Sequence, residues 1–363
     1  MYPMSRQKAF LSMMLILGVI SVINWFVITK NMGKSKLILP QLKITANKLT
    51  RINRVPVDGN DTVKIQQIIS NDKIANVSNK IVERGWVSVR KMGRIGNNMF
   101  QFAAVLAVSK RNNMTPVFPK EILDGIFNID RSGIILDREM KNSLPTISVS
   151  EMRYRNYDKK IWNNFTENTN IIICCYMQSW KYHVEIQEEL KRHFRFKSSI
   201  DNIATKFIDS VYRDIGTRPK NKQPALVGIH VRRTDMATKQ KRKPQFGFVV
   251  APKQYFENAI KHFRSKYKQV HFVVCSDDIK WAQDNIRSTN MTFYTASESP
   301  GVDLAILSHC DHIIMSVGTF SWWAAWLSGG EVVYYAGYPR PKSKIGRNFV
   351  ASDYYFPHWK PMF

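Results

Sequence analysis

The chain has 363 residues, of which 54 are Lys or Arg and 28 are Asp or Glu, so its formal net charge is +26. With 44% hydrophobic and 12% aromatic residues it is too apolar for a disordered basic tail, and its length allows one large or two medium domains. Four cysteines without a CxxC spacing exclude a disulfide scaffold and disfavour a structural zinc site. The charge leaves three classes of partner open, which are nucleic acid, an anionic membrane surface and an anionic small molecule.

The N-terminal segment predicts a membrane anchor. Residues 9–29 (AFLSMMLILGVISVINWFVIT) carry no charge and are long enough to span a bilayer. A cleaved signal peptide is the competing interpretation, but the apolar run is longer than the core of a signal peptide and ends without a small-residue cleavage site. Basic residues on both sides leave the orientation of the anchor undecided. Residues 1–8 then form a short tail, and residues 30–82, which are polar and rich in Asn and Lys, form a stem.

Five Asn-x-Ser/Thr sequons follow the anchor, and they are sites of N-glycosylation if the body of the protein is lumenal. They lie at Asn60, Asn76, Asn113, Asn164 and Asn290. A chain of this composition carries several sequons by chance, so their number is weak support for a lumenal body.

The rest of the chain alternates short apolar strands with helices, which predicts an α/β fold. A strand, a glycine turn and a helix follow one another over residues 86–110. The apolar strands of the second half lie at 225–231, 270–275, 312–317 and 332–335. Continuous apolar strands are typical of parallel sheets covered on both faces. We therefore expect two α/β domains, residues 83–218 and 219–345, and a C-terminal tail at 346–363.

The most specific local feature is the stretch GIHVRRTD at 228–235. The apolar strand stops there and a doubly basic loop begins at its carboxyl end, where open α/β sheets bind ligands. Arginine suits a phosphate, because its planar guanidinium donates two parallel hydrogen bonds and keeps its charge. Strand alternation places His230 and Arg232 on one face and Arg233 on the other, so that one arginine meets the ligand while the other pairs with Asp235. The alternative is an ion-pair turn at the surface.

A second candidate site is the strand-to-helix turn SVGTFS at 316–321. Hydroxyl groups and backbone N–H groups at a helix N-terminus form an anion site, although ordinary capping by Thr319 or Ser321 explains the same residues. The tryptophans that follow have helical spacing in an apolar run and are expected in the core. The acidic stretch SDD at 276–278 is interpreted as a helix N-cap.

The absence of several motifs disfavours particular chemistries. No Asp-x-Asp pair occurs, so a metal-dependent mechanism is disfavoured and no metal site is expected. No nucleophile elbow, HExxH motif or dinucleotide fingerprint occurs, which removes the usual support for a hydrolase, a metalloprotease or a dehydrogenase. The basic run KQKRK at 239–243 is interpreted as a solvated loop rather than a nucleic-acid contact.

Taken in order, the motifs resemble those of the α1,2-fucosyltransferase family. The stretch HVRRTD at 230–235 is similar to the family's H-x-R-R-x-D, GRIGNNM at 93–99 to its GRLGNQM, and TFSWWAAWLSGG at 319–330 to its TFGxWAAxLTGG. Segments 175–182 and 275–281 resemble two further landmarks. The resemblance covers about residues 85–335. It implies a GT-B-like pair of Rossmann-like domains behind an N-terminal transmembrane helix, and a type II Golgi membrane protein with a cytosolic tail and a lumenal catalytic part.

The resemblance also implies roles for individual residues. Arg232 would grip the β-phosphate of a GDP-fucose donor, and Asp235 would hold the loop; both are the expected catalytic residues. The other donor-binding residues that it implies are His230, Arg233, Gly96, Asn97, Thr319 and Ser321. Many family members carry an Asp that reads the guanine edge, whereas this chain has TASE at 295–298, with Glu298 as the candidate replacement. Gln178 and Trp180 are the candidate acceptor contacts, with core packing as the alternative for Trp180.

The implied reaction transfers L-fucose from GDP-fucose to the 2-hydroxyl of a glycan, with inversion and without a metal or cofactor. The expected acceptor is a β-galactoside on a glycoprotein, a glycolipid or a free oligosaccharide. Two alternatives stay open: a catalytically silent, membrane-anchored glycan-binding protein, and a transferase of the same fold that uses another nucleotide sugar. No nucleic-acid partner is expected.

Overall fold

The computed structural model describes residues 84–119, 122–136, 143–152, 155–162, 165–216, 224–296 and 299–363. The chain divides into two units, Met1–Ser78 and Asn79–Phe363, and all of these residues belong to the second. The expected tail, anchor and stem, the sequons at Asn60, Asn76 and Asn164, and Glu298 lie outside them. Within the described part of the chain, no helix is both long and apolar enough to cross a bilayer.

The first half is built on a five-stranded sheet with the order β3-β2-β1-β5-β4, in which every paired strand is parallel. Its strands are β1 (Trp86–Val89), β2 (Thr115–Phe118), β3 (Ile135–Leu136), β4 (Thr146–Val149) and β5 (Asn170–Ile173). Its helical segments are α4 (Ile95–Arg111), α5 (Lys159–Trp162), η3 (Trp180–Tyr182), η4 (Val184–Ile186) and α6 (Gln187–His193). Helix α4 is mostly apolar and buried along most of its length, as expected of a helix packed on more than one side.

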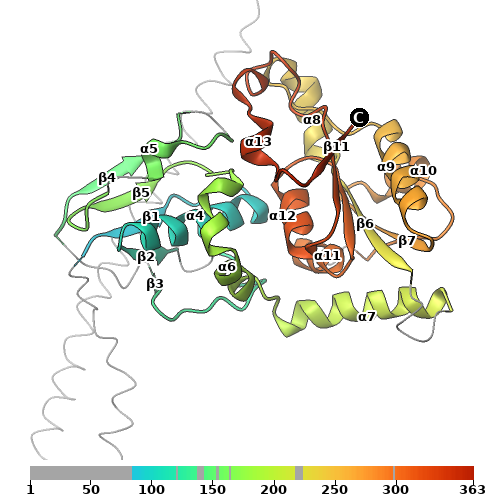
Figure 1. Ribbon diagram of the computed structural model, residues 1–363, viewed down its shortest axis with the longest axis horizontal. Coiled ribbons are helices and arrows are strands. Elements are labelled where there is room, and N and C mark those ends of the chain that lie inside the picture. The colour runs from blue at the N-terminus through green and yellow to red at the C-terminus, as the bar shows by residue number, and fades with distance from the viewer. Residues whose placement is uncertain are drawn as a thin grey trace, which may run out of the picture. The chain divides into compact units, whose positions relative to one another are not determined.

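The second half is built on a six-stranded parallel sheet with the order β11-β10-β9-β6-β7-β8. Its strands are β6 (Ala225–Val231), β7 (Val270–Ser276), β8 (Met291–Phe293), β9 (His312–Met315), β10 (Val332–Tyr335) and β11 (Lys360–Met362). Its larger helices are α8 (Thr234–Arg242), α9 (Lys253–Lys266), α10 (Ile279–Asn285), α11 (Pro300–Ser308) and α12 (Thr319–Ser328). Helices flank both sheets (Figure 1). The predicted α/β class is therefore confirmed.

The central strand β6 is buried on both faces. Val227, Ile229 and Val231 belong to a hydrophobic cluster that includes Phe256 of α9. Leu226 belongs to the other cluster, which also contains α11 and α12 side chains. This two-sided burial explains why the strand reads as a continuous apolar run.

The two halves meet where helices α4 and α12 pack together. The Phe100 ring lies 4.6 Å from the Trp322 ring and 4.9 Å from the Trp323 ring, and the Trp323 indole donates a 3.0 Å hydrogen bond to the Gly96 carbonyl. A Cβ atom on Gly96 would lie 2.6 Å from the carbonyl carbon of Thr319, so only glycine permits this approach. The tryptophans are core residues, as predicted, and they bring the N-termini of α4 and α12 into contact.

Residues 346–363, expected as a tail, are an ordered part of the fold. They form η7 (Gly346–Asn348), α13 (Ala351–Tyr354) and the edge strand β11, which pairs with β10. The Trp322 indole donates to the Tyr354 carbonyl over 2.8 Å, and both side chains are buried. The prediction was wrong because this aromatic-rich segment buries its rings against a helix far away in the sequence.

Helix α7 (Ser198–Asp214) links the two sheets in the chain. It falls in the expected first domain, yet it packs along α11 of the second half (Figure 1). The His309 and Asp201 side chains are hydrogen-bonded there over 2.9 Å.

Candidate active site

A cleft of about 720 Å³ is lined by residues from both halves of the described protein. This volume falls within the range of about 300–1,000 Å³ that is typical of small-molecule sites. Its walls are the glycine turn at 93–97, the carboxyl ends of β6 and β7, the N-termini of α11 and α12, and several aromatic residues. The carboxyl ends of parallel strands are where open α/β sheets bind ligands.

Arg232 and Asp235 form an ion pair in this cleft. The Arg232 Nε and Nη2 atoms donate to the Asp235 carboxylate over 2.9–3.1 Å, and the Arg232 backbone N–H donates to Ser316 Oγ. The Nη1 atom of Arg232 lies beside Gly318 at the start of α12. The expectation that the arginine facing the ligand and the arginine pairing with Asp235 are different residues is therefore wrong, because Arg232, which lines the cleft, is also the one that pairs with Asp235.

Asp235 is surrounded by cations. Lys239 Nζ lies 2.9 Å from its carboxylate, and Arg94 of the glycine turn lies 3.7 Å from it. Burial raises the pKa of Asp235, but the hydrogen bonds from Lys239 and Arg232 outweigh burial and hold it below the ordinary value. The carboxylate is ionised at neutral pH and is a weak base.

Arg233 is not among the described residues that line the cleft. Its guanidinium stacks 3.7 Å from the Trp281 ring and its Nε lies 3.5 Å from Asp278. The Asp278 carboxylate also accepts from the Trp281 backbone N–H and is the N-cap of α10, so the stretch does cap a helix, but with Asp278 as the cap and not with acidic residues in the first turn. Asp277 accepts from the Arg233 backbone N–H over 2.7 Å and thereby holds the loop.

His230 is a buried neutral group at the back of the cleft. Its Nδ1 lies 2.5 Å from Ser321 Oγ, and its ring lies 4.8 Å from the Phe320 ring. Burial lowers the pKa of His230 to about 4. Ser321 is fully buried behind His230, so its contact is with the histidine rather than with the space of the cleft.

Two helix N-termini open into the cleft without side-chain caps. Helix α4 follows Arg94, and α12 follows Gly318, which has a φ of 91°. The capping explanation for the second turn is wrong, because Thr319 Oγ1 donates to Asn97 Oδ1 over 2.9 Å instead. Uncapped N–H groups carry the positive end of each helix dipole, and anions bind at such positions.

The orientation of the Asn97 amide is fixed by a chain of buried hydrogen bonds. Arg155 Nε donates to Gln178 Oε1 over 2.8 Å, and Gln178 Nε2 donates to Asn97 Oδ1 over 2.7 Å. Because arginine can only donate, it determines which end of each amide accepts. The Asn97 oxygen is thereby occupied, and its NH₂ group remains as the donor.

The predicted acceptor residues lie outside the cleft lining. Gln178 is fully buried and positions Asn97, as described above. The Trp180 indole donates to the Ser352 carbonyl over 3.0 Å, and its ring lies 5.0 Å from the Phe356 ring. The structure supports the packing alternative for Trp180.

Asp303, in the first turn of α11, is a cleft residue that the sequence analysis missed. Its Oδ1 is buried without a hydrogen-bond partner in the described structure, and burial raises its pKa to about 6. The helix start at Ser299 and Pro300 was the available signal, because it places Asp303 one turn into a helix that begins at the cleft.

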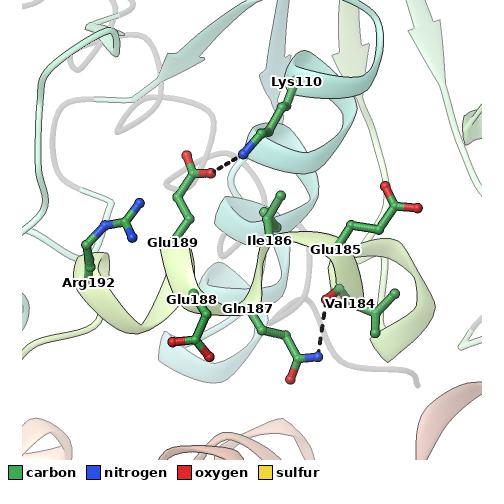
Figure 2. Close-up of a pocket in the computed structure, with 8 residues that line it drawn as sticks. All are labelled: Lys110, Val184, Glu185, Ile186, Gln187, Glu188, Glu189 and Arg192. Atoms are coloured by element: carbon green, nitrogen blue, oxygen red, sulfur yellow. Dashed lines mark hydrogen bonds and ion pairs between the residues drawn. The ribbon is translucent and has the colours of Figure 1, made fainter.

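A second, smaller hollow of about 440 Å³ lies on η4, α6 and the end of α4. Figure 2 shows that charged and polar side chains line it, and that Lys110 reaches Glu189, over 2.9 Å. It contains none of the predicted site residues.

The chain is similar to proteins of known families. The family model described as Glycosyl transferase family 11 matches residues 54–362. The galactoside alpha-(1,2)-fucosyltransferase 2 of Pongo pygmaeus is 28% identical over 285 residues, which are 76% of this chain and 79% of that protein. The corresponding protein of Sus scrofa is 29% identical over 287 residues, with the same coverage of 76% and 79%. The solved structure of fucosyltransferase NodZ from Bradyrhizobium, at 16% identity and a TM-score of 0.42, covers 67% of this chain and 92% of its own.

The fold and the site define an α/β protein with two parallel sheets and a cleft that presents an arginine and two helix N-termini. The chain belongs to glycosyl transferase family 11, and it is a glycosyltransferase.

Proposed function

We propose that the protein transfers L-fucose from GDP-fucose to the 2-hydroxyl of a β-galactoside glycan, with inversion and without a metal or cofactor. The observation that carries the proposal is the meeting of Arg232 with the uncapped N-termini of α4 and α12 in one cleft. The names of the relatives support the fucosyl donor and the galactoside acceptor.

The diphosphate of the donor binds between Arg232 and the start of α12. The Arg232 Nε and Nη2 atoms are held by Asp235, so Nη1, beside Gly318, is the edge that meets the phosphate. Asp235 is thus a positioning residue that fixes the guanidinium before the donor arrives. Preorganised charge of this kind stabilises a leaving diphosphate without reorganisation during the reaction.

Asp303 reads the nucleobase. A guanine presents two neighbouring N–H donors, at N1 and N2, and a carboxylate accepts both. The buried Oδ1 of Asp303 has no hydrogen-bond donor among the described residues. Asp303 therefore takes the part for which Glu298 was the candidate.

The chemistry is mainly electrostatic. The transition state for fucosyl transfer resembles an oxocarbenium ion that separates from the diphosphate. Neither His230, which is neutral and bonded to Ser321, nor Asp235, which is paired with cations, is a strong general base. Stabilisation of the leaving group by Arg232 and the helix N-termini therefore carries the reaction, and Asn97 offers its NH₂ group at the same edge.

The proposed location in the cell rests on the membrane anchor that the sequence predicts at residues 9–29. We place the catalytic part in the Golgi lumen of a type II membrane protein. Asn113 and Asn290, the sequons among the described residues, are both exposed and lie at positive φ, 52° and 57°. Such turns are accessible to glycosylation.

The donor is tested by competition between GDP-fucose and GDP-mannose for the full-length chain. We expect the protein to release GDP from labelled GDP-fucose in the presence of β-galactosides. Excess GDP-mannose should not reduce this release. Equal use of both donors would support the alternative of another nucleotide sugar, and glycan binding without GDP release would support a silent binding protein.

A further inference from the structure

A row of aromatic rings and lysines leads out of the cleft. Lys239 and Phe248 line the cleft, and the Lys239 Nζ lies 5.5 Å from the Phe248 ring. The Phe248 ring stacks at 6.2 Å and 10° on the Phe246 ring, which lies 4.7 Å from Lys344 Nζ and 5.6 Å from Lys243 Nζ. We refer to these five residues as the outer track.

The outer track lies in a region of uncompensated positive charge. The segments 239–243 and 340–347 each carry four basic residues, and no Asp or Glu occurs between residues 236 and 256 or between 332 and 352. In the described structure, Lys239 is the member of these segments that is paired with a carboxylate, on Asp235. Such a field attracts anions and is not neutralised by the protein itself.

The turn that follows the first segment is fixed against the second segment. The backbone N–H groups of Lys344 and Ile345 donate to the carbonyls of Gln245 and Phe246 over 2.9 and 3.0 Å. Gly247 adopts a φ of +96°, and a Cβ atom there would overlap Ser343 Oγ. The lysines therefore stand on a packed double segment, in contact with α8, rather than on a free tail.

We propose that the outer track binds an acidic part of the acceptor, a glycan that carries sulfate or carboxylate groups beyond the sugar that receives the transfer. This inference rests on the proposed function, which brings an acceptor into the cleft. The flat rings suit the apolar faces of sugars, and the amines beside them suit anionic substituents. The row begins among cleft residues and continues outward, so one oligosaccharide can occupy both.

An acceptor is favoured over a membrane surface because of this geometry. Binding to anionic lipid depends on the number of basic residues near a plane and does not need a connection to a cleft. The outer track has that connection through Lys239 and Phe248.

The test compares two forms of one acceptor, a β-galactoside oligosaccharide and the same oligosaccharide with a sulfate on a sugar distant from the accepting galactose. We expect the wild-type full-length chain to have a lower KM for the sulfated form, and this preference to shrink at high salt because exposed charges are screened. The charge-reversed variant Lys243→Glu/Lys344→Glu should change the ratio of the two KM values at least about tenfold in favour of the neutral form.

The matched control is Lys206→Glu/Lys261→Glu, which makes the same change of charge at exposed positions on α7 and α9. It should keep the wild-type ratio. A ratio that is equal in all three proteins, or one that changes as much in the control, would overturn the proposal.

A binding measurement separates this inference from the proposed function. If no acceptor is fucosylated, the proposed function fails, and the sulfated oligosaccharide is titrated into each protein by calorimetry. At least tenfold weaker binding by the track variant than by the control would still support the outer track, and equal affinities would overturn it. Dependence of phosphatidylserine vesicle or single-stranded DNA binding on the same lysines, without glycan binding, would also overturn it.

Discussion

The Gln178 side-chain amide donates a 2.7 Å hydrogen bond to Asn97, which lies 81 residues away in the sequence, and Gln178 itself accepts a hydrogen bond from Arg155. Because Arg155 has no acceptor, the whole chain of hydrogen bonds has one direction and ends in the NH₂ group of Asn97. A residue expected to touch the acceptor instead sets the orientation of a residue that lines the cleft.

Replacing Gln178 by Glu tests this role. The carboxylate still accepts from Arg155 but cannot donate to Asn97 Oδ1, so the amide of Asn97 loses its fixed orientation. We expect kcat to fall about tenfold to a hundredfold, the cost of one unmade buried hydrogen bond, with a smaller change in the KM for GDP-fucose. The control is Gln269→Glu, at an exposed position, and equal kinetics for the two variants would contradict the positioning role.

Arg232 carries the largest expected effect on catalysis. Removing its guanidinium in Arg232→Ala should lower turnover on the order of 100-fold or more, about 3 kcal/mol, as the loss of a preorganised charge donor does. Arg232→Lys should fail nearly as badly, because an ammonium cannot bind Asp235 through two nitrogens and also reach the diphosphate. Initial rates with saturating acceptor measure both, and near-normal turnover by the Lys variant would refute the role.

We expect the affinity for the donor to depend on pH through the ionisation of Asp303. Burial raises its pKa to about 6, and two guanine N–H donors would favour the ionised form. Affinity for GDP-fucose should therefore be constant above pH 7 and fall below pH 6, by at most about tenfold per pH unit. The affinity is measured by calorimetry at each pH with GDP-fucose, because the diphosphate of this ligand keeps its charge over this range. Asp303→Asn should bind more weakly and lose the pH dependence, and an unchanged profile would contradict the assignment.

Replacing Gly96 by Ala should destabilise the contact between the two halves. The Cβ atom of Gly96→Ala would meet the backbone of Thr319 and Phe320 at 2.6–2.7 Å, and backbone cannot rotate aside. We expect a loss of about 1–3 kcal/mol in the free energy of unfolding, measured as a lower Tm, together with reduced donor binding. Gly125→Ala, which has open space around it, is the control and should leave Tm nearly unchanged.

The parts of the site that could be predicted from sequence are those carried by a single stretch of chain. The end of strand β6 and the loop after it predict Arg232 and Asp235 as site residues, and the turn before α12 predicts Thr319. A strand end and a helix start are local signals in the sequence. Local patterns could not show that Arg232 serves both Asp235 and the cleft, since the alternation rule stops where the loop begins.

The remaining features depend on contacts between distant segments. The role of Gln178 rests on Asn97 and Arg155, and the burial of Tyr354 rests on Phe100 and Trp322. No periodicity in either segment carries that information. Asp303 could not be predicted for a different reason, because it lies in the first turn of α11, beyond the stretch 295–298 in which the guanine-binding acid was expected.

The most direct test of the account is transfer of labelled fucose from GDP-fucose to a panel of β-galactosides by the full-length chain, with Arg232→Ala in parallel. The account predicts an α-linked fucose on the 2-hydroxyl of galactose from the wild-type protein, and a loss of about 100-fold or more in the variant. No transfer from GDP-fucose to any galactoside, or transfer that is insensitive to the loss of Arg232, would contradict it.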